Sequence, residues 1–115
     1  MARPLTCLLF GAALCAGPGT TVPVRADELP TFAIVAKDGR LMPERIDVPA
    51  RKKIKLTIRN EGPGPIEFEN LDLRIEKVLA PGASSFLVIH SLKPGTYRFI
   101  DEFHAATGAM ELIAK

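Results

Sequence analysis

Cysteine is scarce in this chain, and tryptophan is absent. Among 115 residues the only cysteines are Cys7 and Cys15, and both lie close to the N-terminus. If that segment is removed, the remaining chain can form no disulfide and can offer no thiolate to a metal ion. Whether the N-terminal segment is retained therefore decides which cysteine chemistry is open to the protein.

The first residues have the features of a secretory signal peptide. A short basic start precedes an apolar run at 5–16, which is too short to span a bilayer. A Val-Arg-Ala sequence at 24–26 then supplies a small-residue cleavage pattern. The alternative, an apolar first strand of the domain, fits less well because a Gly-Pro-Gly break follows the run. We predict a signal peptide over residues 1–26 and an exported, periplasmic domain over residues 27–115.

The predicted mature domain also lacks net charge. The whole chain carries 15 Lys and Arg against 13 Asp and Glu, and Arg3 and Arg25 leave with the signal peptide, so equal numbers remain. Nucleic-acid binding therefore lacks its electrostatic basis. The basic run at 51–53, with Lys55 and Arg59 beyond it, is interpreted as the leading turn and solvent face of a strand. A docking patch for an acidic partner is the alternative.

No segment of the sequence shows a convincing helical period, and hydrolase motifs are missing. There is no Gly-x-Ser-x-Gly turn and no Gly-rich phosphate loop, so hydrolytic catalysis is not indicated. Ile54, Leu56 and Ile58 alternate with polar neighbours, which is typical of a half-buried strand. Turns separate further short segments, so that strands are expected at about 31–36, 46–48, 53–60, 66–69, 73–79, 84–90, 97–101 and 109–114. We predict an all-β fold, a Greek-key β-sandwich of seven to eight strands.

The last quarter of the chain holds the most informative stretch. After a turn at 94–95, Tyr97, Phe99 and Asp101 share one face of the predicted strand. If the aromatic face is the core face, Asp101 lies at the edge of an apolar interior, where an ionised carboxylate needs a partner or a metal ion. His104 follows three residues later and is the nearest candidate for a second ligand.

This stretch resembles the C-terminal metal loop of the cupredoxins. In blue copper members of that family, the position matching Asp101 is a Cys thiolate and the position matching His104 is a copper-binding imidazole. A further histidine of those proteins is replaced here by Ile66 or Glu67, after a similar Pro-rich loop at 61–65. The resemblance implies a β-sandwich with a metal site. The oxygen-rich donor set suits Cu(II), iron or Mn(II) better than Cu(I).

Within that family the chain looks most like the EfeO-type cupredoxin-like proteins of periplasmic ferrous-iron uptake systems. Those proteins carry a Glu-aromatic-Glu segment and a glutamate on the next strand, which match Glu67, Glu69 and Glu76. Glu76 is expected to face Glu69 across neighbouring strands, and like charges so close favour a bound cation or a raised pKa. We therefore expect a copper or iron ion to be bound through Asp101, His104 and one or more of Glu67, Glu69 and Glu76.

Each candidate ligand also has a purely structural interpretation. Asp101 can be a strand-end carboxylate bonded to backbone N–H groups or to an arginine, His104 an exposed loop residue, and the glutamates a solvated strand face. Met110 is interpreted as a core residue. Met42 is interpreted as a core or rim residue, with a soft metal ligand as the alternative, and His90 as structural or exposed.

These features favour a periplasmic cupredoxin-like protein that binds copper, iron or both. By resemblance its role is to handle or oxidise ferrous iron for transport, with a periplasmic iron-binding protein and a membrane permease as partners. A ferroxidase-like activity is implied only by that resemblance. The alternatives are a copper carrier that passes its ion to an oxidase or chaperone, and a metal-free interaction module. Membrane insertion of the mature chain is not expected.

Overall fold

Nine strands and a 3₁₀ turn occupy residues 28–115, which together with Gly19 are the residues that the computed structural model describes. The predicted signal peptide, apart from Gly19, lies outside the described residues and stays a prediction. None of the described residues forms a helix long and apolar enough to cross a membrane. The elements are β1 (Thr31–Lys37), β2 (Arg40–Met42), β3 (Arg45–Val48), β4 (Ile54–Asn60), β5 (Ile66–Asn70), β6 (Ile75–Leu79), β7 (Ser84–Ile89), β8 (Gly95–Asp101), η1 (Glu102–His104) and β9 (Ala109–Ala114).

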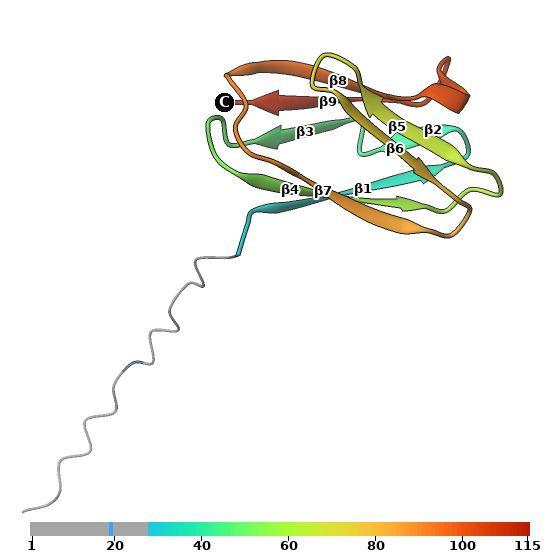
Figure 1. Cartoon of the computed structure of the whole chain (residues 1–115), viewed down its shortest axis with the longest axis horizontal. Helices are drawn as coiled ribbons and strands as arrows, with labels where there is room; N and C mark the ends of the chain where they lie inside the picture. Colours follow the sequence, from blue (N-terminus) through green and yellow to red (C-terminus); the bar gives the residue numbers. More distant parts are fainter. Residues whose placement is uncertain (1–18, 20–27) are drawn as a thin grey trace, which may run out of the picture.

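The strands form two sheets that pack face to face, as Figure 1 shows. One sheet has the order β2-β1-β4-β7, and the other has the order β3-β9-β8-β5-β6. The pairs β1/β4 and β3/β9 are parallel, and the remaining neighbours are antiparallel. The predicted all-β sandwich is therefore confirmed.

Alternation of apolar and polar side chains decides which face of each strand is buried. In β4, Ile54, Leu56 and Ile58 are buried, while the residues between them are half-buried or exposed. Successive side chains of a strand point to opposite faces, so these three face the second sheet. The period-2 pattern that predicted this strand is confirmed by the structure.

Two details differ from the expected strand set. The short strand β2 was not predicted, because only Leu41 in it is buried and three residues show too little alternation to be read. The strand expected at 73–79 begins only at Ile75, since the preceding residues form a turn. In that turn Arg74 has a positive φ of 56° and its N–H bonds to the Leu71 carbonyl. Asn70 Oδ1 also accepts a hydrogen bond from the Leu73 N–H at 2.9 Å, which holds the turn closed.

The core of the described domain lies between the two sheets. Phe68 on β5 and Phe99 on β8 are fully buried and stack with ring centroids 4.8 Å apart. Leu112 and Met110 on β9 are buried beside them, so the interpretation of Met110 as a core residue is confirmed. Every core residue among those that the structure describes lies at position 32 or later, so the described domain supplies a hydrophobic core of its own, and we expect residues 27–115 to fold by themselves.

A buried asparagine joins the loops at one end of the sandwich. Asn60, the last residue of β4, is fully buried, and its Nδ2 donates to the carbonyls of Gly64, Leu79 and Ala80 at 2.9–3.2 Å. Its Oδ1 accepts from the Gly62 N–H at 2.9 Å. One side chain therefore connects the β4–β5 loop to the end of β6, next to the end of the sandwich where η1 lies.

Candidate metal centre

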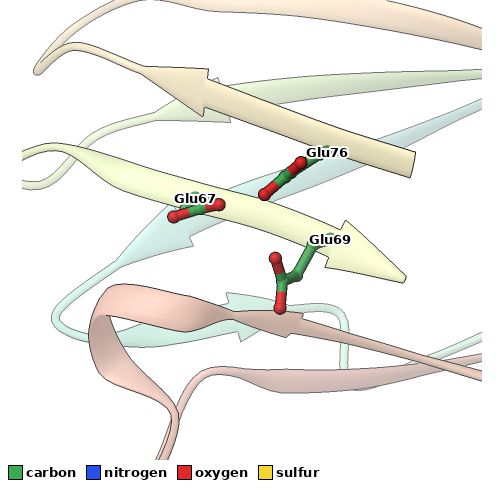
Figure 2. A group of neighbouring side chains, drawn as sticks. All are labelled: Glu67, Glu69 and Glu76. Carbon is green, nitrogen blue, oxygen red and sulfur yellow. The ribbon is translucent and has the colours of Figure 1, made fainter. Parts of the chain in front are cut away.

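Three glutamates converge on the outer face of the five-stranded sheet. Glu69 on β5 pairs directly with Glu76 on β6, as the sequence predicted, and Glu67 lies two residues before Glu69 on the same face. Each of the three residues offers a carboxylate oxygen, and these oxygens lie within 4.8 Å of one another. Figure 2 shows the three side chains gathered over the β5–β6 pair, with the Glu69 carboxylate turned toward the segment of β8 and η1. We call Glu67, Glu69 and Glu76 the acidic cluster.

A fourth carboxylate, that of Glu102, approaches the acidic cluster from the start of η1. A hydrogen bond shared with Glu102 is the largest influence on Glu69, and together with burial and the neighbouring carboxylates it raises the pKa of Glu69 to about 7. A hydrogen bond shared with Glu76, burial and repulsion from nearby carboxylates raise the pKa of Glu67 as well. Sharing a proton in this way is the expected response of carboxylates packed together.

The acidic cluster lacks a cationic partner among the described residues. None of the ion pairs within residues 28–115 involves Glu67, Glu69, Glu76 or Glu102. The Glu69 side chain is also largely covered, since the residue is only 5% exposed. A covered carboxylate such as that of Glu69, with no lysine or arginine partner, is well placed to be neutralised by a metal ion or by a proton, whereas Glu67 is half-buried and Glu76 is exposed.

Asp101 lies on the other face of the same sheet. It pairs with Phe68 and shares the face of Phe99, so its side chain points toward the core, where it is 1% exposed. The prediction that Asp101 borders the apolar interior is therefore confirmed. Its Oδ1 accepts hydrogen bonds from the N–H groups of Glu67 at 3.0 Å and Phe103 at 3.1 Å. These bonds cap η1 and fasten it to β5, which is the structural role considered for this carboxylate.

His104 completes the hydrogen bonding of Asp101. Its Nδ1 lies 2.6 Å from Asp101 Oδ2, and its side chain is 42% exposed. With the proton on Nδ1, the ring donates to the carboxylate and keeps a lone pair on Nε2, which is the nitrogen left to bind an ion. Asp101 therefore orients the imidazole. Both carboxylate oxygens of Asp101 already accept hydrogen bonds, from the N–H groups of Glu67 and Phe103 and from His104.

The five predicted ligands thus form two groups. The acidic cluster lies on the outer face of the sheet, and Asp101 with His104 lies on the core face and at its end. Within residues 28–115 no group of three or more candidate ligands joins Asp101 or His104 to the glutamates with all ligand atoms inside 4.8 Å. The backbone of β5 separates the two groups. This arrangement therefore does not favour a single ion bound by both.

The described residues do not fit a blue copper centre. The position beside Asp101 and His104 that would need a second imidazole is occupied by Ile66, which is buried in the core. Met110 is 1% exposed among apolar neighbours, and Met42 is a partly exposed residue at the end of β2. His90 follows β7 at the opposite end of the sandwich and is exposed, as expected. An imidazole and hard carboxylate oxygens are the donors that remain.

Sequence reasoning missed two features of this end of the molecule. Glu102 was overlooked, although its position directly after Asp101 would place it on the outer face beside Glu67 if the strand alternation simply continued. Gly108 was passed over as part of a loop. A Cβ at Gly108 would lie 2.9 Å from the Asp101 Cβ and 3.1 Å from the His104 carbonyl oxygen, so only glycine lets the chain pass this closely.

Comparison with known proteins assigns the chain to a family. The cupredoxin-like domain family matches residues 5–114. An uncharacterized protein of Rickettsia prowazekii (strain Madrid E) is 34% identical over 108 residues, which cover 90% of this chain and 83% of that protein.

Solved structures show the same fold at low sequence identity. Dithionite-reduced auracyanin from Roseiflexus castenholzii has a TM-score of 0.62 at 18% identity and covers 74% of this chain and 96% of its own. The metal-binding domain of the Cu(I)-exporting P-type ATPase of Streptococcus pneumoniae D39, solved with Cu(I), has a TM-score of 0.66 at 13% identity and covers 74% of this chain and 84% of its own. The family match, the relative and the shared fold together show that this chain belongs to the cupredoxin-like domain family.

Proposed function

We propose that this protein is a periplasmic metal-binding protein that holds an iron ion through Glu67, Glu69 and Glu76. The observation that carries the proposal is the convergence of three carboxylate oxygens within 4.8 Å, with no lysine or arginine paired to them among the described residues. Glu102, which contacts Glu69, supplies a further oxygen at the edge of the acidic cluster. Such a group is stabilised by a cation and is destabilised by its own repulsion without one.

The chemistry of the donors supports iron over Cu(I). Carboxylate oxygens are hard ligands that suit Fe(II), Fe(III), Mn(II) and Cu(II), whereas Cu(I) selects thiolate and thioether sulfur. A redox-active ion bound there would exchange electrons with a partner, while the residues of this chain hold it and compensate its charge. Fixed to β5 and β6, Glu69 and Glu76 approach from directly paired positions, so the sheet itself sets the spacing of two ligands.

The role that this site supports is the handling of ferrous iron for uptake. The Glu-aromatic-Glu segment on β5 with a paired glutamate on β6 is the feature that resembles the EfeO-type proteins. A periplasmic iron-binding protein and a membrane permease are the partners that such a role requires. Whether the bound iron is oxidised on this protein is a separate property, which a ferroxidase assay with Fe(II) and oxygen measures.

Metal titration of the mature domain tests this proposal. Residues 27–115 are titrated by calorimetry with Fe(II) under argon, with Mn(II) and with Cu(II). Each of Glu67→Gln, Glu69→Gln and Glu76→Gln should weaken iron binding by at least about tenfold, because each removes an anionic ligand. Glu111→Gln is the matched control, since Glu111 lies exposed on β9 of the same sheet, away from the acidic cluster.

Two results would contradict the proposal. Iron affinity that is equal in the parent and the three variants would place the ion elsewhere. No binding of any of these metals by a folded domain would favour the metal-free interaction module.

Copper carriage through His104 is the second candidate, because the hydrogen bond between His104 Nδ1 and Asp101 Oδ2 orients the ring with Nε2 available. His104 and Asp101 also line a hollow of about 210 Å³ at the end of the sandwich, formed with Asn60, Ile66 and the turns at 37–40 and 62–64. Loss of Cu(II) binding in His104→Ala, with iron binding unchanged, would support this function and would show that the two sites are separate.

A further inference from the structure

The strands of the four-stranded sheet contribute only positive charge to its outer face, although Glu28, just before β1, adds a carboxylate at the edge. Strands β2, β1, β4 and β7 contain four cationic side chains and not one carboxylate. The strand pairing places all four on the face that points away from the core, because their neighbours in each strand are the buried residues. We call this surface the basic face; its cations are Lys37, Arg40, Lys55 and Arg59.

Exposed apolar side chains lie along the β7 edge of the basic face. Phe86 on the edge strand β7 is 54% exposed, and it lies in one row with Thr57 and Ala33 across the sheet. The Lys55 Nζ lies 4.5 Å from the centre of the Phe86 ring. Val88 follows on β7, and together with Lys55 and Phe86 it lines a shallow hollow of about 420 Å³ that Glu28, Leu29 and Thr31 complete. An exposed aromatic under a lysine is an amphipathic pair, with an apolar body and a charged head.

The charges of the basic face are only partly compensated by neighbouring residues. Arg59 pairs with Glu61 at 3.4 Å, and Arg40 lies 3.9 Å from Glu44. Lys37 and Lys55 have no carboxylate within 4.0 Å among the described residues, and the same holds for Lys53 just before β4. Exposed Arg51 and Lys52 extend the positive surface around that end of the sheet.

The opposite face of the sandwich is mainly acidic, although Arg45 and Arg98 also lie on it. The acidic cluster and Glu102 lie on the outer face of the five-stranded sheet, so the molecule is electrically polarised across its two layers. A surface with negative charge would therefore attract the basic face and repel the face that holds the acidic cluster. We propose that the basic face docks the mature protein onto an anionic phospholipid surface, with Phe86 and Val88 against the headgroup boundary and the acidic cluster facing away.

The shape of the basic face favours a lipid surface over an acidic protein. The recess described beside Phe86 is a shallow hollow. A stable protein complex covers about 800 Å² on each partner and needs matching shape. A bilayer has no fixed shape to match, and clusters of about four to eight lysines and arginines near an exposed apolar group are the feature that anionic lipids bind.

Vesicle binding tests the proposal independently of any metal. Residues 27–115 are sedimented in EDTA with vesicles of phosphatidylcholine alone, and with vesicles that contain about one third phosphatidylglycerol. We expect binding only to the second kind, and weaker binding as the salt concentration rises. Replacing Lys53 and Lys55 together by Gln should weaken it by about 30-fold, since each cation near such a surface contributes about fivefold.

The matched control removes the same charge from the other face. Arg45→Gln with Arg98→Gln changes the net charge equally, on exposed residues of β3 and β8, and should alter binding by less than about threefold. Phe86→Ser should weaken binding, whereas Phe103→Ser, a similarly exposed phenylalanine on η1, should not.

Absence of binding to the anionic vesicles would overturn the proposal and would favour an acidic protein as the ligand of the same face. Equal losses in the two double variants would also overturn it, because they would show that net charge alone drives the association. Iron binding by the acidic cluster is measured separately, so failure here leaves that proposal standing.

Discussion

Glu69 lies in the most unusual environment of the acidic cluster. It is almost covered, faces Glu76 across the strand pair, and shares a hydrogen bond with Glu102. The carboxylates of Glu76 and Glu102 therefore make ionisation of Glu69 unfavourable. Below about pH 7, a proton on Glu69 therefore lessens the repulsion among these carboxylates.

The pKa of Glu69 leads to a prediction about the metal-free protein. Folding raises this pKa from 4.5 to about 7, so the folded state holds a proton that the unfolded state has lost in that interval. Stability from this group should be fully present below about pH 4.5 and should decrease as the pH rises to about 7. Urea unfolding in EDTA at several pH values measures this decrease, which should be smaller in Glu69→Gln than in the parent and unchanged in Glu111→Gln. An equal pH dependence in all three proteins would contradict the assignment.

Asp101 is predicted to be a structural residue rather than a ligand of the ion at the acidic cluster. Asp101→Ala should lower the free energy of unfolding by about 2–4 kcal/mol, because the N–H groups of Glu67 and Phe103 lose their buried acceptor. Asp101→Asn keeps one acceptor oxygen and should cost less.

Metal titration of the same two variants gives the second readout. If Asp101→Asn folds and still binds iron with an affinity within about threefold of the parent, the separation of the two groups is supported. A loss as large as that in Glu69→Gln would mean that Asp101 belongs to the iron site.

At the scale of the elements, strand pairing brings the acidic cluster together. Residues 66–70 of β5 pair with β6 along their whole length, whereas the ladder between β5 and β8 is limited to Phe68 and Glu69. The end of β8 therefore turns away into η1 just where Glu102 reaches the acidic cluster. The two loops beside this region, 61–65 and 80–83, depend on Asn60 for their connection.

Removal of the Asn60 side chain should therefore loosen this end of the sandwich. Asn60→Ala leaves one N–H and three carbonyl groups without their shared partner and should destabilise the domain by about 2–4 kcal/mol. Asn60→Asp preserves the volume but places a carboxylate against three carbonyl oxygens, so it should be at least as harmful. Thermal unfolding followed by circular dichroism measures both variants. A shift of Asn60→Ala within the error of the parent would show that water replaces the side chain.

At the scale of the whole molecule, the two sheets carry different chemistry. The outer face of the four-stranded sheet is basic and partly apolar, and the outer face of the five-stranded sheet carries the acidic cluster. A single core holds the two faces back to back. Binding of an ion on one face and contact with a surface on the other can therefore occur together.

The exported form is a further prediction at this scale. Processing after Ala26 should yield residues 27–115, a cysteine-free chain, since Cys7 and Cys15 leave with the signal peptide. The intact mass of protein recovered from the periplasm measures the cleavage site. A mass that includes both cysteines would show that the N-terminal segment is retained.

Much of the fold could be predicted because it depends on local patterns. The alternation of Ile54, Leu56 and Ile58 with polar residues is enough to predict a half-buried strand, and turn residues separate that strand from its neighbours. The pairing of Glu69 with Glu76 followed from two strands joined by a short turn. Strand β2 could not be found, because three residues with one buried side chain carry too little pattern.

The sequence by itself determined the sandwich, the strand faces, the lack of a thiolate in the predicted mature domain and the list of candidate ligands. Only the tertiary structure decided how those ligands divide. Asp101 and Glu67 are joined by a hydrogen bond from the Glu67 N–H, yet their side chains lie on opposite faces of one sheet. The physical reason is that strand alternation fixes the face of each residue relative to its own neighbours, whereas the pairing of β5 with β8 fixes which faces coincide. That pairing joins segments more than thirty residues apart, as the hydrogen bond between Glu67 and Asp101 shows, and no local pattern encodes it.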